Sequence, residues 1–373
     1  MIFSSSCDSI KVATSTVRKL LTKTEINKGE LSKVELQAKD DSVSYLFASD
    51  DISYRVEIDG AEILHEGVIL TDIEVVWDTL KPFTDRSVTL TFELDDDSEV
   101  LIGDGINSDE PFISEGVISE GIDLSRDLTQ LNKVVVPRLP FLNQLNIAKQ
   151  LQRKTFSEAT THINVKMCNG VSYVQSFNFT GLFEGQIEGL VVSHPIHFLL
   201  DKPSLSRVIR TLSSTKENDI TLYFEEDTII LTAKHLYVEL PAISDHEMIE
   251  VYSSLPYQDL GKTVYKEVVN GKEWGKDLKS RRKESPERLT ITTKGGLKYG
   301  FSDEGVSDAF SYPFKNALNL SASFKDDISV GIGTRSNGFP LIVEKNTERE
   351  KIIIAMTGFE ENVAPVSERN QAA

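Results

Sequence analysis

Few residues of this chain have the types and spacing that catalysis requires. Residues 271–277 contain two glycines followed by a lysine, as a phosphate-binding loop does. Only three residues separate these glycines, and Asp277 stands where such a loop has Ser or Thr. The glycines at 331, 333 and 338 do not have the spacing of a dinucleotide-binding turn. We therefore expect no nucleotide-binding loop in this sequence.

Metal-binding and nucleophilic sites are not predicted either. His194 and His197 are close in sequence, but no Cys or carboxylate has the spacing of further ligands, which favours a structural or surface role. The acidic run at 95–97 lacks the Gly and terminal Glu of a calcium-binding loop, so we interpret it as a solvated turn. No serine elbow or Cys/His pairing is recognisable. The sequence predicts a protein that is not an enzyme and has no cofactor or metal.

The bulk composition predicts a soluble protein of several domains. The chain has 373 residues, of which 39% are hydrophobic, and this length suggests about two to three domains. It has no run of about 18 apolar residues that would cross a membrane, and residues 1–8 do not resemble a signal peptide. Cys7 and Cys168 form no disulfide framework, which fits a reducing compartment. We expect a cytoplasmic protein.

Charged residues are distributed unevenly along the chain. The net charge of −18 by itself argues against nucleic-acid binding, because phosphate binding needs Lys and Arg. Half of the 40 Lys and Arg residues, however, lie in five candidate helices that hold only three of the 58 acidic residues. One basic helix alone would be an ordinary solvated face, but five indicate a positive surface lined by helices. These helices span residues 10–24, 139–157, 203–216, 262–283 and 314–325, whereas a sixth, residues 72–85, is acidic.

The candidate helices belong to a repeated unit. Tyr45, Tyr173 and Tyr299 each lie in a strand-like run after a turn signal, and their spacings of 128 and 126 residues are about a third of the chain. Around them the order strand, helix, three strands occurs twice per third. We therefore expect three copies of one module, at residues 1–125, 126–244 and 245–358, followed by a flexible tail at 359–373.

The third copy is the least regular. We expect a strand over residues 245–253, and a helix that begins at 259 and is interrupted by Gly271 and Gly275. The modules as a whole belong to the α+β class, because helices covering one face of antiparallel sheets explain both the repeat and the charge distribution. The helices would form a positive surface and the sheets a negative one.

The repeat, the basic helices and the last hairpin together resemble the DNA sliding clamps of the bacterial β type. This hairpin consists of residues 340–344 and 351–356, and it is similar to the last hairpin of both bacterial and PCNA-type clamps. The resemblance covers nearly the whole chain in its architecture. The divergent sequence, the irregular third module and the tail are typical of a phage-encoded or otherwise atypical clamp. Such a clamp would act at the nucleoid in the cytoplasm, or in the host cytoplasm if it is viral.

The resemblance implies a closed ring of two chains, in which helices line a hole that holds double-stranded DNA. Lys and Arg side chains of these helices would contact phosphates without reading the base sequence. The partners would be a replicative DNA polymerase, a clamp loader and a second copy of the chain. The DNA-binding residues implied are Lys11, Arg18, Lys19, Lys23, Lys149, Arg153, Lys154, Arg207, Arg210, Lys276, Lys279, Arg281, Arg282 and Lys315.

Partner proteins of this family insert short peptides into an apolar pocket between the second and third modules. Gly181 and Leu182 are followed here by Phe183 and Glu184, where the family often has a Gly-His-Arg-Leu-like run. An ordinary core is the alternative interpretation of the apolar residues at these positions. The pocket residues implied are Thr180, Gly181, Leu182, Leu205, Ile209, Leu341, Val343, Ile354, Ala355 and Met356.

Three alternatives remain open from the sequence. The ring would be a trimer if the third module does not complete the pattern. A virion or scaffold protein would use the repeats for assembly only, without any salt-dependent contact to DNA. A hydrolase is disfavoured because no catalytic constellation is recognisable.

Overall fold

The computed structural model describes most of the chain, and the statements below concern the described residues. The acidic run at 95–97 and most of the predicted tail lie outside them. The described residues are 1–21, 33–85, 88–94, 99–104, 110–113, 116–117, 121–152, 158–178, 181–255, 263–282, 288–292, 297–299, 309–313, 317, 321, 324–334, 340–356 and 359–360.

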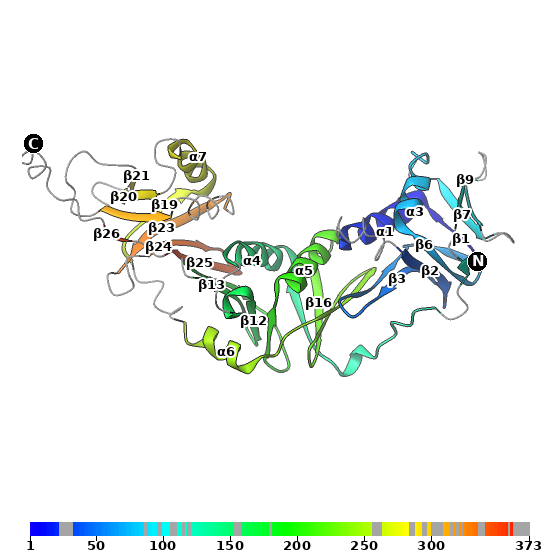
Figure 1. The fold of residues 1–373 in the computed structure, drawn as a ribbon, viewed down its shortest axis with the longest axis horizontal. Helices are drawn as coiled ribbons and strands as arrows, with labels where there is room; N and C mark the ends of the chain where they lie inside the picture. Colours follow the sequence, from blue (N-terminus) through cyan, green and yellow to red (C-terminus); the bar gives the residue numbers. More distant parts are fainter. Residues whose placement is uncertain are drawn as a thin grey trace, which may run out of the picture. The chain divides into compact units, whose positions relative to one another are not determined.

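The chain forms two compact units, each assembled from two separate stretches of sequence (Figure 1). Met1–Leu139 and Ser206–Ala242 make the first unit, and Pro140–Leu205 and Ile243–Ala373 make the second. Each unit contains two antiparallel sheets with helices packed against them.

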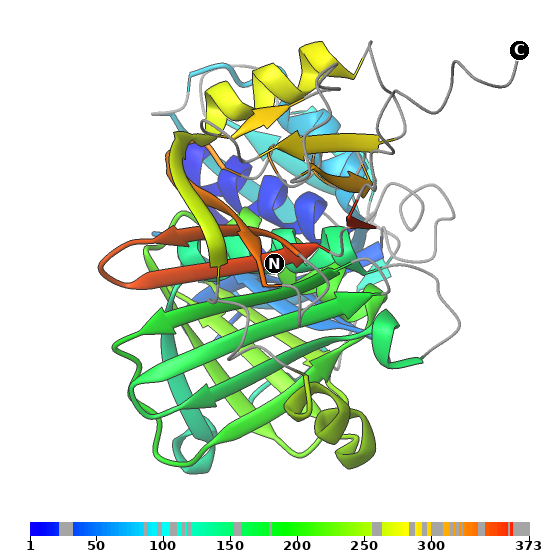
Figure 2. The same ribbon diagram turned by 90° about the vertical axis from the view of Figure 1, so that its left-hand side faces the viewer.

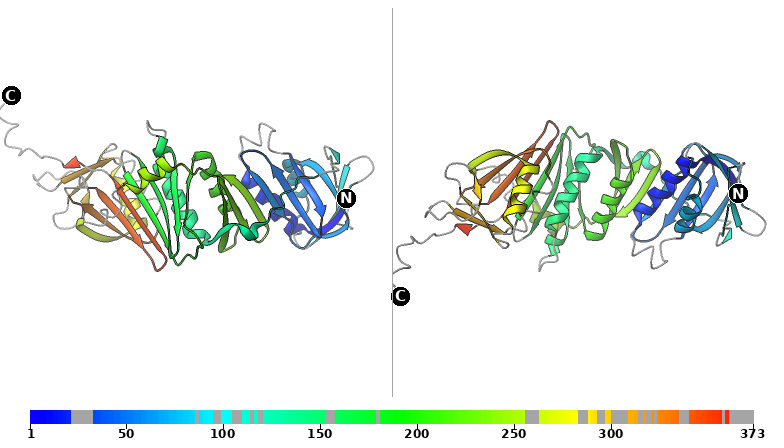
Figure 3. Two further views of the ribbon diagram at one scale, coloured as in Figure 1. Left: turned by 90° about the horizontal axis from the view of Figure 1, so that it is seen from below. Right: turned by 90° about the horizontal axis from the view of Figure 1, so that it is seen from above.

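The first unit has a five-stranded sheet, in the order β5-β1-β7-β8-β9, and a nine-stranded sheet, in the order β10-β6-β2-β3-β4-β18-β17-β16-β11. In the views of Figure 3, α1 faces the viewer from above and strands of the nine-stranded sheet do so from below. The elements are β1 (Ile2–Ser6), α1 (Cys7–Leu20), β2 (Lys33–Lys39), β3 (Ser42–Ala48), β4 (Ser53–Glu57), β5 (Glu62–His65), β6 (Gly67–Asp72), α3 (Ile73–Leu80), β7 (Thr89–Leu94), β8 (Glu99–Gly103), β9 (Glu110–Ile113), β10 (Gly116–Val117), a short 3₁₀ helix (Leu128–Gln130), β11 (Asn132–Pro137), most of α5 (Lys202–Ser214), β16 (Asp219–Glu225), β17 (Thr228–Ala233) and β18 (Leu236–Pro241).

The second unit has an eight-stranded sheet, in the order β15-β12-β13-β14-β25-β24-β23-β19, and a four-stranded sheet, in the order β21-β20-β22-β26. Figure 2 shows the strands of the eight-stranded sheet side by side. The elements are α4 (Arg138–Leu151), a short 3₁₀ helix (Glu158–Thr161), β12 (Ile163–Cys168), β13 (Val171–Asn178), β14 (Gly181–Glu188), β15 (Ile196–Leu200), α6 (His246–Ser253), β19 (Thr263–Asn270), α7 (Gly271–Arg281), β20 (Arg288–Thr292), β21 (Lys298–Tyr299), β22 (Ala309–Pro313), β23 (Asp327–Gly333), β24 (Leu341–Asn346), β25 (Glu350–Met356) and β26 (Phe359–Glu360).

Local sequence explains why α1 forms and which face it buries. The Ser6 hydroxyl caps its first turn by accepting from the Ser9 N–H at 3.1 Å, and Asp8 in that turn suits the positive end of the helix dipole. The buried face carries Ile10, Ala13, Thr14, Val17 and Leu20, which have helical spacing. The helix therefore leaves its basic residues on the side away from the sheet.

The predicted α+β class and the repeated order of elements are confirmed. Strand, helix and three strands recur as β1-α1-β2-β3-β4, β6-α3-β7-β8-β9, β11-α4-β12-β13-β14 and β15-α5-β16-β17-β18. All ladders between described strands are antiparallel. In the last part of the chain, β19-α7-β20-β21 begins the same order, and residues 317 and 321 are helical between β22 and β23.

Two strand pairs join stretches that are distant in sequence. β4 pairs with β18, and β14 pairs with β25 along seven residue pairs from Gly181–Met356 to Ile187–Glu350. These pairs continue one sheet from one predicted module into the next. The modules therefore share sheets, which explains why the compact units do not follow the order of the sequence.

The predicted strand at 245–253 is wrong, because α6 spans His246–Ser253. The Asp245 carboxylate caps this helix by accepting from the Met248 N–H at 3.1 Å. Tyr252 is the buried residue of the helix, and the remaining side chains are at least partly exposed. A helix with so narrow a buried face has a weak apolar period, which explains the error.

The predicted helix over the first half of 259–283 is also wrong. Residues Thr263–Asn270 form β19, which is rich in β-branched and aromatic residues and pairs with β23. The helix α7 starts only at Gly271, where the Asn270 side chain accepts from the Glu273 N–H at 3.2 Å. Gly275 does not break it, and it lies on the buried side of the helix, where a Cβ would come within 3.3 Å of the Ser321 Oγ.

Among the described residues, no helix is long and apolar enough to cross a membrane.

Candidate nucleic-acid interface and partner site

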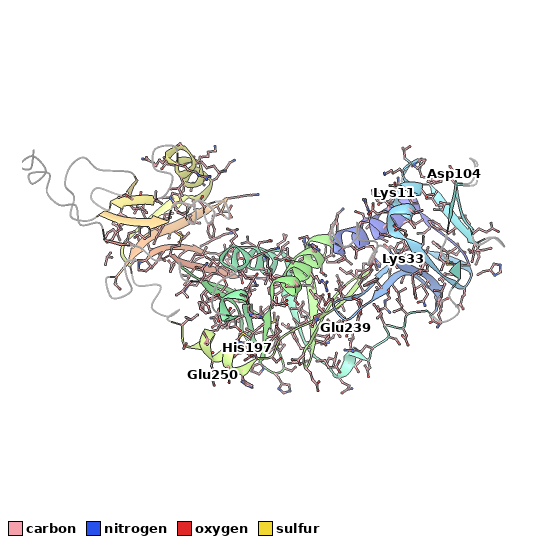
Figure 4. All side chains as sticks on the ribbon, viewed as in Figure 1. Lys11, Lys33, Asp104, His197, Glu239 and Glu250 are labelled. Carbon is pink, nitrogen blue, oxygen red and sulfur yellow. The ribbon has the colours of Figure 1, made fainter. Side chains whose placement is uncertain are left out.

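The basic residues of α1 lie on its exposed stripe. Lys19 is exposed at the last turn. The ammonium of Lys11 donates to the Phe83 carbonyl oxygen, and Figure 4 labels the position of Lys11. Arg18, one position before Lys19, is half-buried. Lys23 lies outside the described residues. Of the predicted set, α1 therefore presents Lys19 most openly to solvent.

Arg18 is held by the neighbouring helix α3. Its Nε and Nη2 donate to the two carboxylate oxygens of Glu74 at 2.6 and 2.8 Å, and its guanidinium carbon lies 4.7 Å from the centre of the Trp77 ring. A bidentate pair stacked on an aromatic face fixes the plane of the guanidinium. Glu74 is one of the acidic residues of α3, and its pairing with Arg18 of α1 explains part of the acidic character of that helix.

The predicted basic residues of α5 and α4 that the structure describes are half-buried. Arg207 donates to the carbonyl oxygen of Asp51 and lies 3.2 Å from the carboxylate of the same residue. Arg210, one turn later, and Lys149, near the end of α4, are at intermediate exposure. Arg153 and Lys154 lie outside the described residues.

Helix α7 has the most open basic face. Lys276, Lys279 and Arg282 are exposed, while Arg281 forms an ion pair with Asp277 one turn earlier at 3.0 Å. The opposite side of the helix is buried and carries Gly271, Trp274, Gly275 and Leu278. Lys315 lies outside the described residues. This helix thus offers several flexible cations on one side, which suits contact with a polyanion.

In the first unit, the sheet face opposite the helices carries both acidic and basic side chains. Tyr45 hydrogen-bonds Thr14 of α1 at 3.0 Å and so marks the helix side of the nine-stranded sheet, and strand alternation then places Glu57 and Glu239 on the far side. Figure 4 shows Glu239 on the side away from Lys11. Arg126 pairs with Glu239 at 3.2 Å. The same alternation places Lys39 and Lys133 on the far side, so acidic and basic side chains are mixed on this face and the charge separation expected from the sequence is incomplete among the described residues.

The predicted apolar site divides between two faces of the eight-stranded sheet. The Ser176 hydroxyl bonds the Ala148 carbonyl of α4 at 3.3 Å, so its register partner Phe183 faces the helix. Phe183 is opposite Ile354, and Ile354 is opposite Val343. By the same register Leu341 and Met356 also face the helix, and all four predicted residues are fully buried core.

Leu182 and Ala355 lie on the other face, which we call the far face. They are register partners, and Ala355 is also opposite Ile342. Leu182 and Leu255 pack against a buried cluster of Ile342, Ile353 and Ala355. These five side chains form what we call the far-face cluster.

The remaining predicted residues lie beside these sets or elsewhere. Gly181 begins β14, and a Cβ there would come within 2.8 Å of the Ala355 carbonyl oxygen, so glycine permits this close approach of strands. In α5, Leu205 is fully buried and Ile209 is partly exposed. Thr180 lies outside the described residues.

Sequence reasoning missed three members of the far-face cluster, Ile342, Ile353 and Leu255. The alternation of side chains along β24 and β25 could have identified the first two. Ile353 is two residues from Ala355 in β25 and therefore shares its face, and Ile342 shares that face as the residue opposite Ala355 in β24. No pattern pointed to Leu255, since it follows a helix that was predicted as a strand.

A polar chain borders the cluster on the far face. The Asn164 amide donates to Gln175 at 2.8 Å, and the Glu184 carboxylate accepts from the amides of Gln175 and Gln186 at 2.8 and 2.7 Å. His197 continues the chain, with Nε2 2.6 Å from the Asn164 side-chain oxygen. Glu184 is the register partner of Ile353, so a buried carboxylate stands directly beside the apolar side chains.

Burial lowers the pKa of His197 to about 4, with smaller contributions from the charges of Lys166 and His246. The ring is therefore neutral at physiological pH, and its nitrogen serves the hydrogen bond to Asn164. No group of three or more His, Cys, Asp or Glu side chains in the described part of the chain is arranged to hold a metal ion.

Comparison by sequence gives no match, either to a family model or to a curated protein. Comparison by structure gives similar folds along nearly the entire chain. The β subunit of DNA polymerase from Streptococcus pyogenes has a TM-score of 0.75 at 12% identity, covering 97% of this chain and 100% of that chain. The DNA polymerase III β subunit of Thermotoga maritima has a TM-score of 0.72 at 13% identity, covering 95% and 99%.

The Helicobacter pylori β clamp in complex with 3,4-difluorobenzamide has a TM-score of 0.70 at 12% identity, covering 96% of this chain and all of the other. All three solved structures match over at least 99% of their length, so the likeness is not confined to one part of the chain. The chain has the fold of the β subunits of bacterial DNA polymerase III, the sliding clamps.

Proposed function

We propose that this protein is a DNA sliding clamp: a closed ring that encircles duplex DNA and tethers a replicative polymerase. The observation that carries the proposal is the match of fold over 95–97% of this chain to clamp subunits that are covered almost completely. The exposed cations of α1 and α7 give independent support, because they lie on the helix side that a clamp turns toward DNA.

The ring would be a head-to-tail homodimer of three modules per chain, at residues 1–125, 126–244 and 245–358. In the two sheets that continue from one module to the next, the joining strands are β18 and β25. Strand β9 is the last strand of its repeat unit, as β18 and β25 are of theirs. It lies at the end of the five-stranded sheet, where its one described neighbour is β8. Pairing of this edge with a second copy would cover it and close the ring.

DNA would be held by charge and by topology together. Lys19, Lys276, Lys279 and Arg282 are long, exposed side chains that contact phosphates without reading bases. The half-buried Lys11, Lys149, Arg207 and Arg210 would add to the positive potential. Carboxylates on the sheet faces would repel DNA from the outside. A ring on a duplex keeps its bound polymerase at a high effective concentration near the template.

Partner proteins, namely the polymerase and a clamp loader, would bind through short peptides at the far-face cluster. Its apolar side chains suit an aliphatic or aromatic anchor residue, and Leu182 and Phe183 stand where the family often has His and Arg. We propose that a small aromatic ligand of the class bound by the Helicobacter pylori clamp, 3,4-difluorobenzamide, fits the same cluster.

Imaging of the purified protein by negative-stain electron microscopy, combined with its mass in solution, tests the assembly. The proposal predicts a ring with six lobes and the mass of two chains. A ring with the mass of three chains would show that the trimer is correct. A monomer at micromolar concentration that also fails to bind nicked circular DNA would refute the clamp function.

A further inference from the structure

The far-face cluster is covered by a residue of the chain itself. Leu182 belongs to β14, Ile342 to β24, and Ile353 and Ala355 to β25, so four of the five side chains are fixed by the sheet. Leu255 comes from a different segment, two residues beyond the end of α6. Ile342, Ile353 and Ala355 are no more than 4% exposed, whereas Leu182 and Leu255 are only partly buried. The outermost layer of the cluster therefore includes a side chain that the sheet does not hold.

Helix α6 is anchored firmly up to Tyr252. The Tyr252 hydroxyl donates to the His162 carbonyl oxygen at 2.7 Å, and its ring meets the Phe177 ring edge-on with centres 5.1 Å apart. At the other end of the helix, backbone hydrogen bonds join Ile243 and Leu199 at 2.8 and 3.1 Å. These contacts position the helix over the far face and bring the chain to the cluster.

The attachment of Leu255 is weaker. Its N–H approaches the Tyr252 carbonyl oxygen at 3.4 Å, which is long for an N–H···O hydrogen bond. Its remaining described contact is the apolar packing against the cluster. A change of backbone angles at residues 254 and 255 would move this side chain away and leave the contacts of Tyr252 intact. The cluster would then expose an apolar surface with the carboxylate of Glu184 beside it.

We propose that Leu255 is an intramolecular plug that occupies the place of a partner's apolar anchor and leaves when the partner binds. The inference rests on the proposed function, because it assigns regulation to the peptide site of the clamp. The ligand that fits is an aromatic or branched aliphatic side chain, since it must replace a leucine against isoleucine, alanine and leucine. The apparent affinity of the site is the affinity of the open site multiplied by the fraction of molecules in which Leu255 has left it.

The test uses 3,4-difluorobenzamide as the probe, titrated into the full-length chain and followed by fluorine NMR. The variant Leu255→Ser removes the plug, and Val251→Ser on α6, whose side chain is 41% exposed, is the matched control. Loss of one partly buried leucine contact is expected to tighten binding of the probe by roughly five- to tenfold. Val251→Ser should bind as the unmodified chain does.

The opposite result would overturn the plug. If Leu255→Ser binds the probe equally or more weakly, Leu255 is part of the wall of the site. Absence of binding in every variant would also contradict the proposal, because an unplugged apolar cluster must accept the probe. Hydrogen exchange gives a second measurement: the probe should speed exchange of the Leu255 amide if it displaces the plug and slow it if Leu255 closes over the probe.

Retention on nicked circular DNA, measured on the same samples, separates this inference from the proposed function. Retention without any effect of Leu255→Ser would refute the plug alone. A tighter-binding Leu255→Ser variant in a protein that never stays on circular DNA would refute the clamp and leave the plug.

Discussion

Arg18 of α1 and Glu74 of α3 join their two helices by parallel hydrogen bonds, Nε to Oε1 at 2.6 Å and Nη2 to Oε2 at 2.8 Å. Both side chains are about one-third exposed, and Trp77 covers one face of the guanidinium. The ion pair therefore has two opposite effects on the proposed clamp. It stabilises the packing of α1 against α3, and it offsets a positive charge that would otherwise attract DNA to the helix side.

Glu74→Gln should separate these effects. We expect the free energy of unfolding to fall by about 1 kcal/mol, because a bidentate ion pair becomes a single hydrogen bond from Arg18 to a neutral amide oxygen. Affinity for duplex DNA at low salt should rise, because the Glu74 carboxylate no longer offsets the positive charge of Arg18. Denaturant unfolding and a DNA titration measure the two quantities.

Asp78→Asn is the matched control, since it removes the same charge from the same helix. Asp78 pairs with Lys81 at 2.7 Å, but both side chains are at least 60% exposed, so the loss should stay below about 0.5 kcal/mol. Equal effects of the two substitutions would show that Arg18 and Glu74 are not specially coupled.

The double variant Lys276→Glu/Lys279→Glu tests the open basic face of α7. Each phosphate contact that is lost should reduce the slope of log affinity against log salt by about 0.9. Affinity measurements at several salt concentrations give this slope. Lys39→Glu/Lys133→Glu places the same charge change on exposed residues of β2 and β11, on the far side of the nine-stranded sheet, and is the control. An equal loss in both variants would mean that only net charge matters.

Much of the fold was predictable because the repeat and the turns are encoded locally, but the exact register was not. The sequence spacing equates Tyr45 with Tyr173. In the structure, Lys39 opposes Ser42 and Cys168 opposes Val171, so the repeat is 129 residues and Tyr45 corresponds to Val174. Tyr45 is buried toward α1, whereas Tyr173 points to the other face of its sheet. A shift of one residue exchanges the faces of a strand, and composition alone does not detect it.

The candidate site shows the same limit. Of the predicted basic residues that the structure describes, all except Arg282, which directly follows α7, lie on helices, because charge follows the exposed stripe of an amphipathic helix. Their pairing was not predictable: Asp51 reaches Arg207 from 156 positions away. The apolar set mixed helix-side core, such as Ile354, with far-face residues, such as Ala355, because both are apolar neighbours in one strand.

Gly185→Ala should destabilise the second unit by about 1–3 kcal/mol through overpacking. A Cβ at this position would lie 2.6 Å from the side-chain carbonyl group of Gln144, which is fully buried and donates to the Gln186 carbonyl oxygen at 3.0 Å. Unfolding of the single variants and of Gly185→Ala/Gln144→Ala gives the coupling. The alanine should cost less when Gln144 is already truncated, and strictly additive effects would contradict the account.

His197 should make stability depend on pH in one direction. Its pKa is about 4 in the folded protein and about 6.5 in an unfolded chain, so the unfolded state binds more protons between these values. The contribution is fully present above pH 6.5 or so and is lost as the pH falls toward 4. Allowing for the part of the ring that water reaches, we expect a loss of about 1–2 kcal/mol. His197→Asn, compared with the unmodified chain at pH 7 and 4.5 by denaturant unfolding, should show a smaller loss, and an identical pH dependence would contradict this.

The most direct test of the clamp is whether its hold on DNA is topological. The protein is loaded onto a nicked circular duplex, with the loader of its own replication system if one is needed, and the DNA is then cut once. The account predicts stable retention on the circle in high salt, where contacts to phosphates are weak, and rapid loss after linearisation as the ring slides off the ends. Equal loss from circular and linear DNA would contradict it, because a protein held only by charge does not distinguish the two.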